Sequence, residues 1–82
     1  MAVRDIVRMA NQIADYFKAY SHDVAVKETA THIRNFWDPR MRRQLAEHLA
    51  AGGQGLSGIA LEAGRKLAQE SAAKEQLTAT KT

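Results

Sequence analysis

The sequence predicts an all-α domain, a small bundle of three to four short helices with a frayed C-terminal tail. Three observations support this fold class. Apolar residues recur at spacings of three and four along almost the whole chain, and no segment alternates as a strand would. Helix-breaking residues gather at three short sites, 21–23, 38–39 and 52–55. With 82 residues and no cysteine, the chain is expected to form one domain without disulfides.

The first two helices are each predicted from one apolar stripe. The stripe of the first helix consists of Val3, Ile6, Ala10, Ile13, Phe17 and Tyr20. Ser21 and Asp23 are both candidate N-caps for a second helix after the break. The stripe of the second helix consists of Val26, Ala30, Ile33 and Trp37.

An Asp-Pro pair separates the second helix from the third. Pro39 disfavours the α conformation at Asp38, so the second helix should end before it. Asp38 can then accept hydrogen bonds from the free N–H groups of the next helix, whose first position suits Pro39. The third helix should end at Gly52-Gly53, because glycine allows the left-handed backbone common just past a helix end. Its apolar side consists of Met41, Leu45, His48 and Leu49, and Arg43 and Glu47 are expected to pair on its exposed side.

A fourth helix is predicted to begin after Ser57, which is a candidate N-cap preceded by Leu56 as a hydrophobic staple. Its stripe is thinner and richer in alanine, with Ile59, Ala60, Ala63 and Leu67. We expect a helical domain over 1–69 and a polar tail over 70–82 that is partly helical or disordered.

All aromatic residues fall within 16–37, namely Tyr16, Phe17, Tyr20, Phe36 and Trp37. Because aromatic side chains dominate burial energetics, the firmest packing is expected where the end of the first helix meets the end of the second. The C-terminal half has only aliphatic and alanine side chains to bury. We therefore expect it to gain much of its order from a neighbouring chain.

The sequence gives no sign of chemistry carried by this chain. His22, His32 and His48 lack the spacing of a metal site, and His32 is better placed to stack on Phe36 four residues later. The carboxylates are scattered, no serine stands in a nucleophile motif, and the glycines at 52–55 lack the Gly-Lys-Ser/Thr ending of a phosphate loop. We expect no catalytic residue, no metal ligand and no cofactor of its own, and hence no enzyme activity in this chain alone.

Charge and hydropathy point to a soluble cytoplasmic protein. No apolar run approaches the about 20 residues of a membrane span, and the first residues carry charges where an export signal would be apolar. The formal net charge of +3 is mild, so nucleic acid is a disfavoured partner. The alternative nonetheless stays open that the chain is a small basic helical nucleic-acid-binding regulator, with arginines at a helix start meeting phosphates.

The segment 36–43 is the best candidate for a binding surface. It holds the only tryptophan, the only proline and three of the twelve basic residues of the chain. Tryptophan and arginine are over-represented among interface hot spots, so this loading favours docking over a plain helical corner. The competing interpretation is a core tryptophan beside solvated arginines. The candidate partner-binding residues here are Phe36, Trp37, Asp38, Pro39, Arg40, Met41, Arg42 and Arg43.

Three blocks of the sequence, 9–14 (MANQIA), 32–42 (HIRNFWDPRMR) and 51–56 (AGGQGL), together resemble one family. In order and separation they are similar to the delta subunit of NAD-dependent formate dehydrogenase. The resemblance covers roughly 6–67, and the Phe-Trp-Asp-Pro-Arg-Met-Arg run is its most specific part. Asn11 and Gln12, within the first block, become further candidate partner-binding residues on the polar side of the first helix.

The resemblance implies an accessory role in a cytoplasmic hetero-oligomer. In such complexes the large alpha subunit oxidises formate at a molybdenum or tungsten pterin, and other subunits carry iron–sulfur clusters, FMN and the NAD site. The delta subunit has no redox centre and is associated with assembly, cofactor maturation or stability. Docking on the alpha subunit is therefore expected, with Trp37 and Phe36 in an apolar pocket and Met41 in a less regular gap. The three arginines would pair with partner carboxylates or hold phosphates of the pterin cofactor. A transient maturation chaperone is the remaining possibility.

Overall fold

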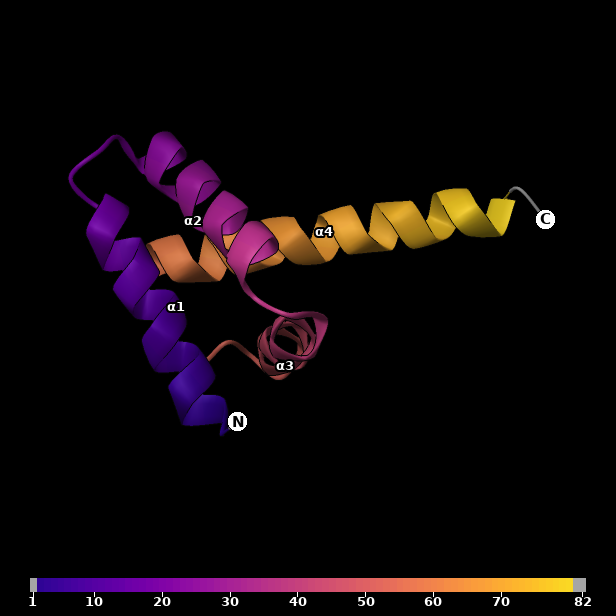
Figure 1. Ribbon diagram of the computed structural model, residues 1–82, viewed down its shortest axis with the longest axis horizontal. Helices are drawn as coiled ribbons and strands as arrows, with labels where there is room; N and C mark the ends of the chain where they lie inside the picture. The colour runs from indigo at the N-terminus through magenta and orange to yellow at the C-terminus, as the bar shows by residue number, and fades with distance from the viewer. Residues whose placement is uncertain (1, 81–82) are drawn as a thin grey trace.

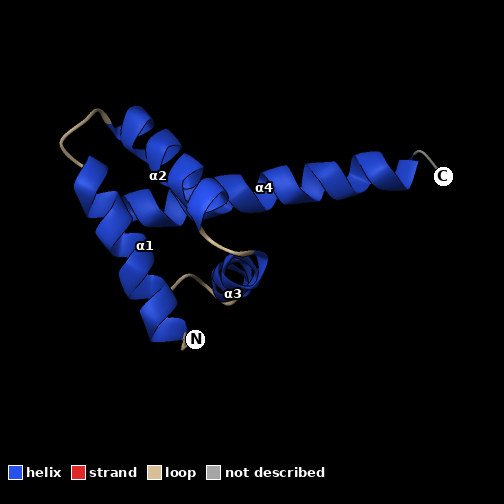
Figure 2. Ribbon diagram, viewed as in Figure 1, coloured by secondary structure: helices blue, strands red, loops and turns tan. Residues whose placement is uncertain are grey.

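The computed structural model describes the backbone of residues 2–80 and the side chains of residues 2–71. This part of the chain folds into four helices and contains no strand, which confirms the all-α prediction (Figures 1 and 2). The helices are α1 (Val3–Phe17), α2 (His22–Phe36), α3 (Pro39–Ala50) and α4 (Gly58–Thr80). No helix in the described range is long and apolar enough to cross a membrane.

The helices form a bundle in which α2 packs against α1 and α4, and α3 closes the remaining side against α1 and α4. Small side chains dominate the helix crossings, and short side chains let helix axes approach closely. A few larger side chains fill the centre between the four helices. The buried cluster consists of Ile6, Ala10, Ala14, Ile33, Trp37, Leu45 and Ala60.

The helix ends lie where local sequence signals predict them. The Asp38 carboxylate accepts a hydrogen bond from the Met41 N–H at 2.8 Å, and Pro39 is the first residue of α3. Ser57 caps α4, because its hydroxyl oxygen accepts a hydrogen bond from the Ala60 N–H at 3.3 Å. Ser21 occupies the position before α2, but its side chain makes no capping hydrogen bond.

The chain leaves α3 through a loop built on glycine. Gly53 donates to the carbonyl of His48 at 2.9 Å and Gly52 to that of Leu49 at 3.0 Å, the paired bonds of a Schellman motif. Both glycines have positive φ angles, 124° and 67° for Gly52 and Gly53. A Cβ at Gly53 would also lie 2.5 Å from Leu61, so this position needs glycine for space as well as for backbone freedom.

The predicted aromatic packing is wrong. Tyr16, Tyr20 and Phe36 are exposed, at 76%, 58% and 74% of their side-chain surface, whereas Trp37 is buried. A short connection joins the end of α1 to the start of α2, so the two helix ends that were expected to meet lie apart (Figure 1). The buried core is mainly aliphatic, and Trp37 is the one ring within it among the described residues.

The α4 helix contributes to the core itself. Ala60 and Ala63 are fully buried, and a Cβ on Gly64 would lie 2.6 Å from Leu49 on α3. Beyond the bundle α4 continues as a helix to Thr80 and extends away from the other three helices (Figure 1). The proposed boundary between 69 and 70 stays a prediction. The tail expected over 70–82 is helical as far as Thr80, whereas residues 81–82 and the side chains after Ser71 lie outside the described residues.

Candidate partner-binding corner between α2 and α3

The candidate site is the corner formed by residues 34–43, the last turn of α2 and the first turns of α3. The Trp37 N–H donates to the Ile33 carbonyl at 3.0 Å, after which Trp37 and Asp38 have extended backbones. Asp38 then caps α3 through its bond to Met41. The corner is thus rigid at both helix ends, as its sequence predicts.

Within this corner, Trp37 points inward. Its side chain is only 6% exposed and belongs to the buried cluster with Ile33 and Leu45. Because the backbone leaves the helix at Trp37, the ring lies beneath the corner instead of on its surface. The expectation that Trp37 fills a pocket on a partner does not fit this position; the structure shows the core interpretation. Met41, expected to fill a gap on the partner, is half-buried and packs against the same cluster.

Phe36, the neighbouring ring, points outward. It is 74% exposed, although it is a large apolar side chain at the end of a helix. His32 lies one turn earlier, and the two ring centroids are 4.6 Å apart with 34° between the planes. The stacking predicted for this (i, i+4) pair is therefore confirmed.

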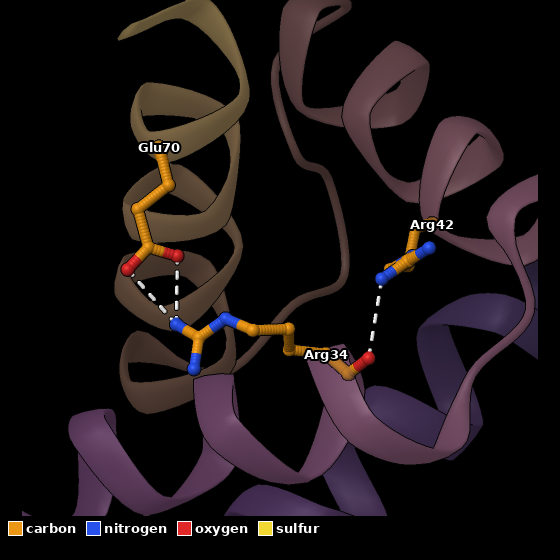
Figure 3. Close-up of polar contacts among 3 residues, drawn as sticks. All are labelled: Arg34, Arg42 and Glu70. Atoms are coloured by element: carbon orange, nitrogen blue, oxygen red, sulfur yellow. Dashed lines mark hydrogen bonds and ion pairs between the residues drawn. The ribbon is translucent and has the colours of Figure 1, made fainter. Parts of the chain in front are cut away.

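Arg42 and Arg34 join the two helices of the corner and link the corner to α4 through surface hydrogen bonds (Figure 3). The Arg42 guanidinium donates to the carbonyl of Arg34 at 3.1 Å, one of the carbonyls left free at the end of α2. The Arg34 guanidinium in turn donates to both carboxylate oxygens of Glu70 on α4, at 2.7 and 2.9 Å. Arg34 and Glu70 were missed as site residues, because 36 positions separate them and no local pattern links them.

Arg40 and Arg43 are exposed and make no hydrogen bond or ion pair within the described part of the chain. Three positions apart on α3, they are neighbours on one helix face, and Arg42 lies on the opposite side. The predicted pair between Arg43 and Glu47 is wrong, since no ion pair joins them. An arginine that precedes its glutamate is the less favourable order on a helix.

Asn11 is an internal structural residue rather than a free polar side chain. Its amide nitrogen donates to the Gly55 carbonyl at 2.9 Å, and its amide oxygen accepts from the Ser57 N–H at 2.9 Å. Asn11 therefore ties α1 to the loop before α4. Although it was expected on the polar side of the first helix as a binding residue, Asn11 is thus used within the fold, whereas Gln12 is exposed.

The other two histidines also contact groups within the chain. The Nε2 atom of His48 donates to the Gln54 carbonyl at 2.7 Å, which closes the loop after α3. His22 at the start of α2 contacts the carboxylate of Glu62 on α4. In the described part of the chain, no three His, Cys, Asp or Glu side chains lie close enough to hold a metal ion.

Comparison with known proteins gives one informative result. No curated protein and no solved structure shows a significant match to this chain. The family model described as NADH-dependant formate dehydrogenase delta subunit FdsD matches residues 5–63. That range includes the whole α2–α3 corner, Asn11 and the glycine loop, and it ends within α4 before Glu70. Since the match covers more than half of the sequence, the chain belongs to the family of formate dehydrogenase delta subunits.

Proposed function

We propose that this chain is the non-catalytic delta subunit of a cytoplasmic NAD-dependent formate dehydrogenase complex. It docks on the large metal-pterin subunit and supports the assembly, cofactor maturation or stability of that subunit. Membership of the delta-subunit family is the observation that carries the proposal. A complex of this kind is a hetero-oligomer, so the function of the chain lies in what it binds.

In this proposal the redox chemistry belongs to the partners. The large subunit holds the molybdenum or tungsten pterin at which formate is oxidised, and iron–sulfur clusters and FMN carry the electrons to NAD. The delta subunit supplies no reacting group. Its contribution is a rigid surface presented by a small helical bundle.

The α2–α3 corner is the surface proposed for docking. Phe36 gives it an exposed ring, and Arg40 and Arg43 give it free positive charge. Asp38, Pro39 and Met41 fix the course of the backbone between the two helices. Trp37 supports the corner from the core, and Arg42 supports it through a surface hydrogen bond. Exposed aromatic and arginine side chains on a rigid frame are typical of interface hot spots.

The candidates on α1 have different roles in the proposal. Asn11 shapes the fold through its two bonds to the loop before α4. Gln12, the next residue, is exposed, and we propose that it contacts the partner at the edge of the interface. Neither residue is expected to dominate binding.

The test is co-purification from the native host. A tagged chain should retain a large iron–sulfur, metal-pterin protein in equal amount, with formate-to-NAD activity in the eluate. Phe36→Ala should reduce that retention. Tyr16→Ala is the matched control. Tyr16 has almost the same exposure as Phe36, 76% against 74%, and it lies at the end of α1, which leads into the start of α2 and not into the corner after α2.

Each other outcome contradicts part of the proposal. Retention of nucleic acid in place of the large subunit would favour the regulator. A large subunit that is bound only before its cofactor is inserted would indicate a transient maturation chaperone. Equal loss in both variants would mean that the corner has no special part in docking.

A further inference from the structure

We infer that the corner recognises an acidic protein surface: Arg40 and Arg43 pair with carboxylates that flank an apolar pocket for Phe36, while Arg34 and Arg42 hold the corner through bonds within the chain. This inference rests on the proposed function, since it describes the face of the large subunit on which this chain docks. It divides four arginines that look alike in the sequence into one inward pair, which bonds within the chain, and one outward pair, which does not.

The inward pair is identified by its bonds. Arg42 donates to the Arg34 carbonyl at 3.1 Å, and it lies on the opposite side of α3 from Arg40. The Arg34 guanidinium is engaged by Glu70, with the nearest oxygen at 2.7 Å (Figure 3). Glu70 lies seven residues beyond the end of the family match at Ala63, so this chain fixes its corner with a residue from outside the matched region.

Arg40, one member of the outward pair, lies where positive charge is unfavourable for the helix. Arg40 is the second and Arg43 the fifth residue of α3, and the first turn of α3 contains no acidic residue. The N-terminus of a helix carries partial positive charge, so cations there oppose the helix dipole. Asp38 accepts the Met41 N–H and Glu70 is held by Arg34. The Asp38 carboxylate at the N-cap offsets part of this cost, but no ion pair joins it to Arg40 or Arg43 in the described part of the chain, so both guanidinium groups are left for an external partner.

The exposed ring of Phe36 favours a protein surface over a free phosphate as the partner of the corner. A free phosphate would need the guanidinium groups but would leave Phe36 without a role. A protein surface can offer carboxylates and an apolar pocket together, and the bidentate geometry of arginine suits carboxylates. One exposed ring and two free guanidinium groups within the segment 36–43 therefore favour an acidic protein face.

The first experiment reverses the outward charges in the full chain, co-expressed with the native complex. The double variant Arg40→Glu with Arg43→Glu should lower retention of the large subunit about tenfold. Retention of the wild type should fall as salt rises from about 0.05 to about 0.5 M, because exposed charges are screened. Arg65→Glu with Lys66→Glu is the matched control: both residues are exposed on α4, and their reversal should leave retention unchanged.

The outcomes separate this inference from the proposed function. If the wild type fails to retain the large subunit, the proposed function is wrong. If the wild type retains it and the Arg40/Arg43 variant does so equally well with an unchanged Tm, the acidic-surface inference is wrong. If the isolated wild type binds pyrophosphate, the Arg40/Arg43 variant does not, and retention of the large subunit is the same for both, the corner is a phosphate site.

The second experiment tests the inward pair. Arg34→Glu should lower the Tm of the chain, because it places two carboxylates together on α2 and α4. The charge swap Arg34→Glu with Glu70→Arg should recover both the Tm and the retention of the large subunit. If the swap recovers the Tm but not the retention, Arg34 itself contacts the partner and the division of the arginines is wrong.

Discussion

The two connections that flank α3 differ in where their polar groups point. In the loop before α4, Asn11, His48 and Ser57 bind backbone groups within the chain. In the α2–α3 corner, Asp38 and Arg42 also bind backbone groups, but Arg40 and Arg43 are exposed and have no partner in the described part of the chain. The family match covers both connections. We therefore propose that the connection before α4 serves folding, whereas the α2–α3 corner also serves binding.

The two aromatic rings of the corner differ in burial: Trp37 is in the core and Phe36 is exposed. Trp37→Ala should destabilise the chain by about 3–5 kcal/mol, because it removes a ring from the buried cluster. In a domain of this size that loss is enough to unfold much of the population. Urea unfolding followed by circular dichroism measures it. A loss below about 1 kcal/mol would show that Trp37 is not a core residue.

Asn11→Ala should give the next largest loss, about 1–3 kcal/mol, since it leaves the Gly55 carbonyl and the Ser57 N–H without their partner. Its exposed neighbour supplies the control, and Gln12→Ala should change stability by less than about 0.5 kcal/mol. Thermal melts of both variants give the comparison. Equal melting temperatures would show that the loop does not depend on α1.

Removal of the α3 cap should have a smaller effect. Asp38→Ala deletes the acceptor of the Met41 N–H and should cost about 1 kcal/mol, or about 4–8 °C in Tm. Asp38→Asn keeps an oxygen at the same place and should recover most of that loss. If both variants melt alike and well below the wild type, the negative charge and not the hydrogen bond is what α3 needs.

Phe36→Ala should have the smallest effect on the isolated chain, within about 0.5 kcal/mol, because the ring is exposed. The same substitution should have the largest effect on binding among single exposed residues. Stability is read from a thermal melt and binding from retention of the large subunit. A variant with a lowered Tm and normal retention of the large subunit would show that Phe36 stabilises the fold and does not contribute to docking.

Local sequence signals were enough to predict the end of α2, both ends of α3 and the start of α4. Asp38-Pro39, Gly52-Gly53 and Ser57 act on backbone groups within a few residues, so their effect can be deduced without the fold. Burial in α2 also followed the apolar period at Ala30 and Ile33. The prediction of aromatic burial failed for two reasons. Tyr16 and Phe36 fall off the predicted stripes, whereas Tyr20 was placed on the first stripe but lies beyond the end of α1, and all three are exposed.

The site was less predictable, because its geometry depends on contacts across the fold. Trp37 stands at the first residue past α2, where the helical period no longer fixes the direction of a side chain. Asn11 meets Gly55 across 44 positions and Arg34 meets Glu70 across 36. Only the packing of α1 and α2 against the second half of the chain brings these groups together. The division of the arginines into inward and outward pairs therefore required the structure.

Side-chain footprinting of the purified complex tests directly whether the α2–α3 corner is the docking surface. Phe36 and Tyr16 are matched probes, exposed at 74% and 76% near opposite ends of α2, which is about 22 Å long. Hydroxyl-radical oxidation of both rings would be compared by mass spectrometry in the free chain and in the complex. We expect that binding protects Phe36 and leaves Tyr16 as reactive as it is in the free chain. Protection of Tyr16 with Phe36 unchanged would show that the corner between α2 and α3 is not the docking surface.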